Sequence, residues 1–375
     1  MNIIYILLAL IAILAIEGII YKKYWPRGIK AHIRFGQDRA VEGDTVELCQ
    51  TLEYTGLLPL PWVRMKFRIS RDIGMPDTPN SIITDYYNCE EVFSIGRMEK
   101  VTRRIPVSCF RRGQHRVFDV DTVSSDLFMT RKLIASFGGN SGITVYPRRT
   151  EIPQLIDAAR QMIGEHIVRR SRVEDPFIFR GVRDYIEGDQ LSHINWRATA
   201  RTDHLSVNQY EYTSELSVSI WLFIEERLDM RDLTLTEECI RIAATMLGTL
   251  IDDGIPVALC CNAGDSGADS STLIGHGCSP EHKDSCLTAL ARLDTQKEAM
   301  SPFEFADRVP KLSGDNELII LISSQTGEKL CRHIKNLSSD RELFWIAPLR
   351  SDDEQEPVGL EYIKNHRVWR VVCER

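Results

Sequence analysis

An apolar run near the N-terminus constrains this chain more than any other feature. Residues 3–20 are almost entirely Ile, Leu and Ala, and the main interruptions are Glu17 and Gly18. As a helix rising about 1.5 Å per residue, such a run reaches about 27 Å, close to the thickness of the hydrocarbon layer of a membrane. We therefore predict a single transmembrane helix that contacts the bilayer through residues 3–20, with residues 1–28 as anchor and basic flank.

The flanks of this run predict its orientation. A cleaved signal peptide is the alternative, but it needs a basic start and a small-residue cleavage site, and the sequence supplies neither well. Positive charges follow the run and none precedes it, which places the N-terminus outside and the bulk of the chain in the cytoplasm of a plasma membrane. Three aromatic residues also follow at once, as in an interfacial belt: Tyr21, Tyr24 and Trp25.

Composition excludes some classes of protein. The hydrophobic share of 43% and the charged share of 26% are typical of globular domains. A net charge of −7 argues against a broad nucleic-acid interface, which needs a clustered basic face. The 10 cysteines are scattered through apolar or alternating runs, which favours buried free thiols in a reducing compartment over disulfides.

Residues 29–148 have the pattern of a β domain. Hydrophobic residues alternate with polar ones over residues 46–54 and 62–69, and further short runs follow at 101–109, 113–120 and 142–146. Several strands of this spacing without a helical period predict an antiparallel, Ig-like β-sandwich. The glycine-rich stretch at 138–142 precedes a strand instead of opening a helix, so we interpret it as a turn and not as a phosphate loop.

The hydrophobic pattern is different over residues 211–375. Apolar strands are expected at 216–224, 257–261, 317–322, 343–347 and 368–373, and helices at 235–252, 280–293 and 327–336. Strands that alternate with helices predict a mostly parallel sheet with both faces covered. The fold class expected for the whole chain is α+β multidomain, in which residues 149–210 form a helix and a connector between the two domains.

That connector holds the densest charged segment, residues 179–202. Four arginines and three carboxylates alternate there with apolar and aromatic residues. This pattern predicts bidentate ion pairs packed against aromatic faces. Gly188 and Asp189 are typical of a turn, and Asp189 is expected to cap the helical run through Trp196.

The charged segment resembles the signature of the domain of unknown function 58 family. Ser192 stands where that family usually has arginine, and members usually begin with two hydrophobic segments, whereas this chain shows one. The resemblance implies a bacterial membrane protein whose second domain is von Willebrand factor A-like, a Rossmann-like α/β fold. The signature residues, predicted to be either structural or partner-binding, are Arg180, Gly181, Arg183, Tyr185, Gly188, Asp189, Ile194, Trp196, Arg197, Thr199, Ala200 and Arg201.

No metal or cofactor site is predicted. Metal-binding von Willebrand domains carry Asp-x-Ser-x-Ser after the first strand, whose oxygens bind a divalent ion. Here residues 224–230 lack both serines, and Arg227 intrudes beside Glu225. The spacing of four potential zinc ligands does not match the paired-ligand patterns of zinc sites, so we interpret them as residues that do not bind zinc. They are His276, Cys278, His282 and Cys286.

The function expected from these observations is that of a non-enzymatic, membrane-anchored scaffold or adaptor. The family resemblance implies a MoxR-type AAA+ ATPase as protein partner, in complex assembly or envelope stress. A metal-dependent adhesion or ligand-binding module is the alternative and would require an outside location. An envelope hydrolase with a Cys–His pair is a third hypothesis, although no cysteine stands beside a histidine in a catalytic context.

Overall fold

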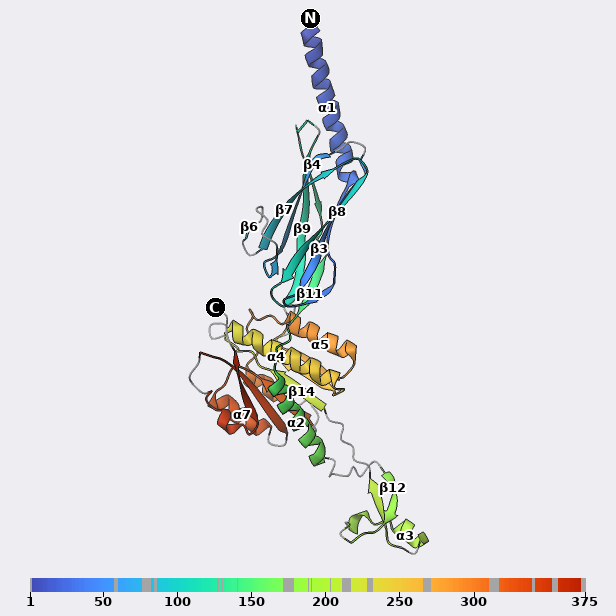
Figure 1. Ribbon diagram of the computed structural model, residues 1–375, viewed down its shortest axis with the longest axis vertical. Helices are drawn as coiled ribbons and strands as arrows, with labels where there is room; N and C mark the ends of the chain where they lie inside the picture. Colours follow the sequence, from blue (N-terminus) through green and yellow to red (C-terminus); the bar gives the residue numbers. More distant parts are fainter. Residues whose placement is uncertain are drawn as a thin grey trace. The chain divides into compact units, whose positions relative to one another are not determined.

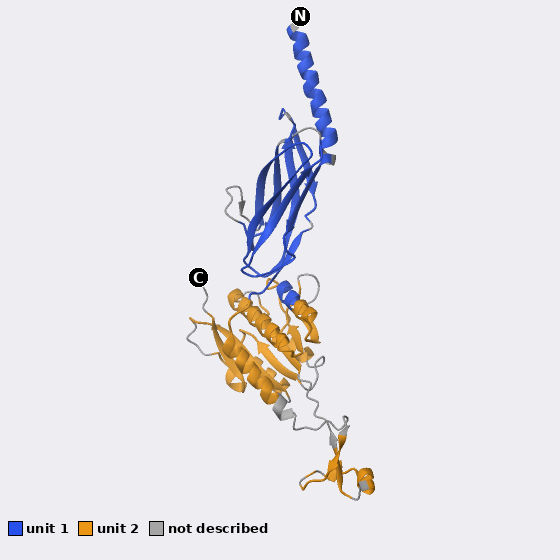
Figure 2. Ribbon diagram, turned by 45° about the vertical axis from the view of Figure 1, so that its right-hand side comes forward, with its two compact units in different colours: residues 1–148, 287–293 blue, residues 149–286, 294–375 orange. Residues whose placement is uncertain are grey.

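The structure is a computed structural model of the chain, and it divides into two compact units (Figure 2). Unit 1 comprises residues 1–148 and 287–293, and unit 2 comprises residues 149–286 and 294–375. The described residues are 2–56, 60–75, 82–83, 86–126, 128–129, 131–139, 141–170, 179–187, 189, 191–202, 204–210, 217–227, 232–265, 271–309, 317–338, 341–352 and 357–371.

Unit 1 contains two sheets whose strands are mainly antiparallel (Figure 1). The first sheet has the order β1-β3-β8-β5, with β1 Ile29–Phe35, β3 Thr45–Tyr54, β8 Glu99–Cys109 and β5 Ile73–Gly74. The second has the order β2-β11-β9-β4-β7-β6, and β10 also pairs with β9. Its strands are β2 Arg39–Val41, β11 Gly142–Tyr146, β9 Gly113–Ser125, β4 Leu60–Ser70, β7 Tyr86–Ile95, β6 Ile82–Ile83 and β10 Lys132–Phe137.

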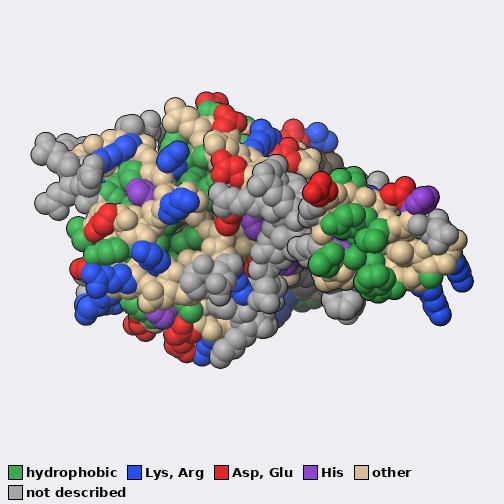
Figure 3. All heavy atoms as spheres, turned by 90° about the horizontal axis from the view of Figure 1, so that it is seen from below, with side chains coloured by type: hydrophobic (Ala, Val, Ile, Leu, Met, Phe, Trp, Pro, Cys, Tyr) green, Lys and Arg blue, Asp and Glu red, His purple; other side chains and the backbone are tan. Residues whose placement is uncertain are grey.

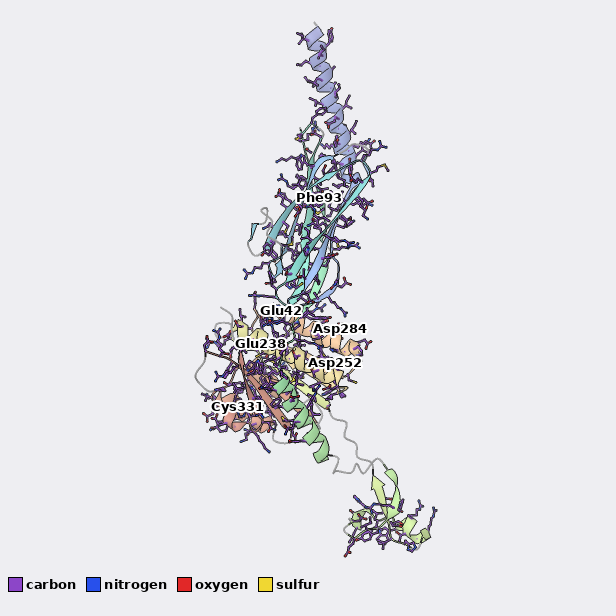
Figure 4. The ribbon with its side chains drawn as sticks, in the orientation of Figure 1. Glu42, Phe93, Glu238, Asp252, Asp284 and Cys331 are labelled. Atoms are coloured by element: carbon purple, nitrogen blue, oxygen red, sulfur yellow. The ribbon has the colours of Figure 1, made fainter. Side chains whose placement is uncertain are left out.

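Strand alternation builds the core of unit 1. β1 alternates buried and exposed residues along its whole length, because successive side chains of a strand point to opposite faces. Inward residues of both sheets, among them Leu48 and Phe67, form one hydrophobic cluster with Phe93 (Figure 4). In the glycine-rich turn, a Cβ on Gly139 would lie 2.3 Å from the carbonyl oxygen of Val117, so close backbone contact requires glycine there.

Helix α1, Asn2–Gly28, precedes these sheets. Its segment Ile3–Trp25 is the one helix of the described residues that is long and apolar enough to cross a membrane, which is weak evidence for an anchor. The predicted aromatic belt is wrong for two of its three residues. Tyr21 and Trp25 are 2% exposed and belong to the core of unit 1, because they share one helix face; Tyr24 is exposed.

Unit 2 is built on a six-stranded sheet of order β16-β15-β14-β17-β18-β19. Neighbouring strands are parallel except for the antiparallel pair β15 and β16. The strands are β14 Ser217–Leu222, β15 Val257–Cys261, β16 Thr272–Gly277, β17 Glu317–Ile322, β18 Glu342–Arg350 and β19 His366–Val371. The α-helices described for this unit outside the charged segment are α2 Pro153–Arg170, α4 Leu233–Asp252, α6 Pro302–Arg308 and α7 Glu328–Leu337. Helix α5, Pro280–Arg292, begins in this unit, and its residues from 287 onward are assigned to unit 1.

Apolar runs explain the centre of this sheet. Every residue of β15 and β17 is buried, as expected for parallel strands covered on both faces. Large side chains fill one cluster beside the sheet, including Trp221, Phe305 and Trp345, together with Cys331 of α7 (Figure 4). Asp232 begins α4 by accepting hydrogen bonds from the amides of Thr234 and Leu235. The predicted last strand, 368–373, extends beyond Val371, and residues 372–375 lie outside the described part.

Candidate functional site

The charged segment folds as a small module of two strands and two short helices. Strand β12, Phe179–Asp184, pairs antiparallel with β13, Ser206–Tyr210, and between them lie η1, Leu191–His193, and α3, Trp196–Thr202. We call residues 179–210 the motif module. Its buried hydrophobic side chains among the described residues are those of Ile194 and Val207, which form a bridge between their backbones. So small an apolar core must be supplemented by polar contacts.

An ion pair closes the loop after β12. The guanidinium of Arg183 donates to both carboxylate oxygens of Asp189, Nη1 to Oδ2 at 2.6 Å and Nη2 to Oδ1 at 2.7 Å. The amide of Ile186 donates to the same Oδ2 at 2.9 Å. The hydrogen bonds from Arg183, followed by that from the Ile186 amide, lower the pKa of Asp189 to about 2. One bidentate pair of the predicted kind is therefore present, and it orders a turn.

Asn195, and not Asp189, begins helix α3. Its Oδ1 accepts a hydrogen bond from the amide of Ala198 at 2.9 Å, and its Nδ2 donates to Oδ1 of Asn208 on β13 at 2.7 Å. Asp189 was the predicted cap, but its carboxylate is already used by Arg183 and Ile186. Thr199 accepts a hydrogen bond from the amide of Ser206, which joins α3 to β13. Asn195 has the residue type and position of a helix cap, so the sequence contained this signal.

The apolar side chains of the motif module point largely to its surface. Leu191 is 72% exposed, Trp196 69% and Ile186 63%, and Val182 and Leu205 are also exposed. Figure 3 shows hydrophobic side chains gathered on the part of the surface that this module forms. The Trp196 indole is exposed, and no cation of the described residues lies over its ring. We call these five residues the apolar face.

Two arginines follow Trp196 on α3. Arg197 and Arg201 are exposed and one helical turn apart, and neither makes an ion pair with a described residue. Like charges at this spacing destabilise a helix slightly, so they do not serve the fold of α3. Tyr185 donates its backbone amide to Leu205, and Gly181 lies in β12 with open space where a Cβ would stand. Gly188 and the side chain of Arg180 lie outside the described part.

The motif therefore separates into two groups. Arg183, Asp189, Ile194 and Thr199 hold the module together. The side chains of Trp196, Arg197 and Arg201 are exposed on its surface. Both groups belong to the signature, and their residue types alone do not distinguish them.

The carboxyl ends of the β14 and β15 strands are closed by an amide network. Asn262 is fully buried; its Oδ1 accepts from the amide of Ile224 at 2.7 Å, and its Nδ2 donates to the carbonyls of Ile224 and Met300. In the same unit, Arg350 at the end of β18 donates to Asp232, which begins α4, at 2.5 Å. Burial acts to raise the pKa of Asp232, but hydrogen bonds from Arg350 and the α4 amides lower it overall.

A buried polar cluster lies where parallel strands β14 and β17 begin, and sequence analysis missed it. The side chain of Glu317 is fully buried and accepts hydrogen bonds from Ser219 Oγ and, at 2.6 Å, from His276 Nε2. The signal was a glutamate at the start of an otherwise apolar run. Ser219 is fully buried, and its hydroxyl donates to the carboxylate and not to the imidazole. The contacts hold edge strand β16 to the sheet.

The four potential zinc ligands are not brought together. His276 contacts Glu317, whereas the His282 ring contacts the carbonyl of Val257 and lies 3.5 Å from the buried Cys286 sulfur. Cys278 is exposed. No group of three or more His, Cys, Asp or Glu side chains within the described ranges is placed to hold a metal ion.

Comparisons with solved structures give weak similarities over about a third of the chain. A cohesin module from a Clostridium perfringens family 33 glycoside hydrolase is 9% identical, with a TM-score of 0.23, and the match covers 32% of this chain and 98% of the module. A metal-bound CARDB domain of Pyrococcus furiosus is 11% identical, with a TM-score of 0.21 and coverages of 31% and 86%. Spo0M, a sporulation control protein of Bacillus subtilis, is 12% identical, with a TM-score of 0.20, and the match covers 36% of this chain and 56% of Spo0M.

A comparison with curated proteins finds no match. The family comparison does: residues 181–354 match the model described as "Protein of unknown function DUF58". The matched segment contains most of the motif module and the first five strands of the six-stranded sheet in chain order, β14 to β18. The match supports the resemblance drawn from the signature residues: residues 181–354 of this chain are similar to the DUF58 family.

Proposed function

We propose that this chain is a membrane-anchored, non-enzymatic scaffold or adaptor that binds a protein partner through the apolar face of its motif module. One observation carries the proposal. The motif module uses polar contacts to hold itself together and leaves five apolar side chains exposed, Trp196 and Leu191 most of all. Gathered exposed apolar residues of this kind mark interaction sites, and tryptophan is prominent among residues that dominate binding energies.

The charge and apolar character of the residues at this face indicate what a partner's surface would carry. Arg197 and Arg201 follow Trp196 on α3, without ion-pair partners in the described part of the chain. A complementary surface would carry apolar residues with carboxylates at their margin, because opposite charges speed and select association. The partner that we propose is a MoxR-type AAA+ ATPase in complex assembly or envelope stress, as the resemblance of the signature residues implies.

We infer that α1 anchors the chain in the plasma membrane as a single span with both units in the cytoplasm. We also infer that the two sheets of unit 1 form an Ig-like sandwich, and that unit 2 outside the motif module is von Willebrand factor A-like. The Asn262 network and the Asp232–Arg350 pair, which occupy strand ends of that sheet, favour a binding role over metal-dependent adhesion.

Affinity capture from detergent extracts of native membranes tests this function. The wild-type chain is expected to retain a MoxR-type AAA+ ATPase, and a Leu191→Ser, Trp196→Ser double variant is expected to lose it while melting at the same temperature. A Val358→Ser variant is the matched control, because Val358 is equally exposed but lies outside the motif module. Equal capture by all three chains would contradict the proposal. Protease accessibility of a C-terminal reporter in intact cells would contradict the orientation.

A further inference from the structure

The lower part of helix α1 is packed on unit 1, and this limits how the helix can sit in a membrane. From Ile3 to Ile16 the apolar side chains are exposed, except that Leu14 is half-buried. From Gly18 onward one face is buried, at Gly18, Tyr21 and Trp25. The helix therefore changes from free to packed about one turn before its first lysine, Lys22.

The exposed part alone is too short to cross a bilayer. Fourteen residues from Ile3 to Ile16 rise about 21 Å, whereas the hydrocarbon core is about 30 Å thick. A spanning helix must continue to the first charges after the run, at Lys22 and Lys23. Gly18 lies about 6 Å before Lys22 along the axis, so the turn at Gly18 is placed at the lipid boundary.

A loop of unit 1 lies beside that turn. The loop joins β9 to β10, and its Arg131 guanidinium packs on Gly18, where a Cβ would lie 3.1 Å from Arg131 Cζ. Buried Asp126 organises the loop, because its carbonyl accepts from the Met129 amide and its Oδ1 accepts from the Arg131 amide. Whatever surrounds α1 at Gly18 therefore also surrounds this loop.

The side chains at the tip of the loop suit lipid. Phe128 is 52% exposed and Met129 65%. Met129 has a φ of 56°, a conformation that non-glycine residues seldom adopt and that persists where surrounding contacts enforce it. Two adjacent large apolar side chains are thus held outward, and an arginine follows whose long stem can reach headgroup phosphates.

We propose that the β9–β10 loop is a second membrane contact, which inserts Phe128 and Met129 into the lipid beside α1. The proposal rests on α1 spanning the membrane, as proposed above. The bilayer is then contacted at two points of unit 1, which fixes the orientation of that unit against the membrane surface.

Depth-dependent fluorescence quenching in the full chain tests the loop. The full chain is reconstituted in vesicles of phosphatidylcholine and phosphatidylglycerol, in a Cys278→Ser, Cys373→Ser background that removes the exposed cysteine and the one outside the described residues. A polarity-sensitive fluorophore is attached to Phe128→Cys or, independently, to Met129→Cys. Lipids with a quencher near the headgroup end of the acyl chain are then added.

Two control positions separate the possible failures. Leu10→Cys labels the free part of α1, and Phe110→Cys labels an equally exposed phenylalanine before the opposite end of β9. We expect a blue shift and loss of most fluorescence at 128 and 129, a blue shift at Leu10, and no change at Phe110. A shifted Leu10 with loop positions that behave like Phe110 would overturn the loop contact alone. An unshifted Leu10 would overturn the anchor and the loop contact together.

Discussion

The six-stranded sheet and the motif module lie in the same unit and are stabilised in different ways. In the sheet, β15 and β17 are wholly buried, and Trp345 is 0% exposed. In the motif module, hydrogen bonds and an ion pair do most of the local ordering, and Trp196 is 69% exposed. A tryptophan therefore fills the core in one region and is exposed in the other.

The same substitution in the two regions gives the largest expected contrast. Trp345→Ala removes a fully buried ring and should lower the free energy of unfolding of unit 2 by about 3–5 kcal/mol. Trp196→Ala should change it by no more than about 0.5 kcal/mol, because it truncates an exposed side chain. Denaturant unfolding followed by circular dichroism measures both. Equal losses would mean that Trp196 is packed and would break the comparison.

Removing the helix cap should have a smaller and local effect. Asn195→Ala deletes the hydrogen bonds to Ala198 and Asn208, and loss of a cap typically costs about 1 kcal/mol. Amide exchange should accelerate in α3 and β13 while β15 and β17 keep their protection. Asn195→Asp, which can still accept from the Ala198 amide, is expected to retain most of the protection of α3. Faster exchange throughout the six-stranded sheet would show that the two regions unfold together.

The Arg183–Asp189 pair predicts a pH dependence confined to the motif module. The pKa of Asp189 is lowered from 3.8 to about 2 by hydrogen bonds from Arg183 and from the Ile186 amide. A carboxyl group whose pKa is lowered in the folded state stabilises that state at pH values above its ordinary pKa. This contribution is lost as the pH falls from about 4 towards 2. Carboxyl titration by NMR measures it, and Arg183→Ala should move the Asp189 pKa back up. An unchanged value would exclude the pair in solution.

Thiol labelling should sharpen the distinction between buried and exposed regions without changing stability. Burial raises the pKa of Cys239 and of Cys286 to about 12, so both are protonated and shielded at neutral pH. Cys278 is exposed and should react with a maleimide in the native protein. Mass spectrometry of labelled peptides, with a denatured sample as control, locates the reactive thiols. If Cys286 were labelled as fast as Cys278, its burial on α5 would be contradicted.

Buried apolar runs made the sheet of unit 2 predictable. The expected strands 257–261 and 317–322 have the observed bounds, and the expected helix 280–293 differs from α5 by one residue. Edge strand β16 was missed, because Gly275, His276 and Gly277 leave no alternating apolar pattern there. The short helix α6 was missed as well, since seven residues carry too little periodicity.

The motif module was less predictable for a related reason. Residue types alone indicated a bidentate pair, and Arg183 with Asp189 forms one. Sequence could not say which carboxylate was already engaged, so the cap was assigned to Asp189 although Asn195 provides it. Nor could it say which way Trp196 faces, because a seven-residue helix offers no second turn of apolar residues to define a buried side.

A binding titration tests the central claim most directly. The full chain, held in a lipid nanodisc, is titrated with a purified MoxR-type AAA+ ATPase, and the dissociation constants of the wild type and of the Leu191→Ser, Trp196→Ser variant are compared. The account predicts saturable binding that weakens at least about tenfold in the variant, as expected when interface anchors are removed. Binding of equal strength by both chains, or binding by neither, would contradict it.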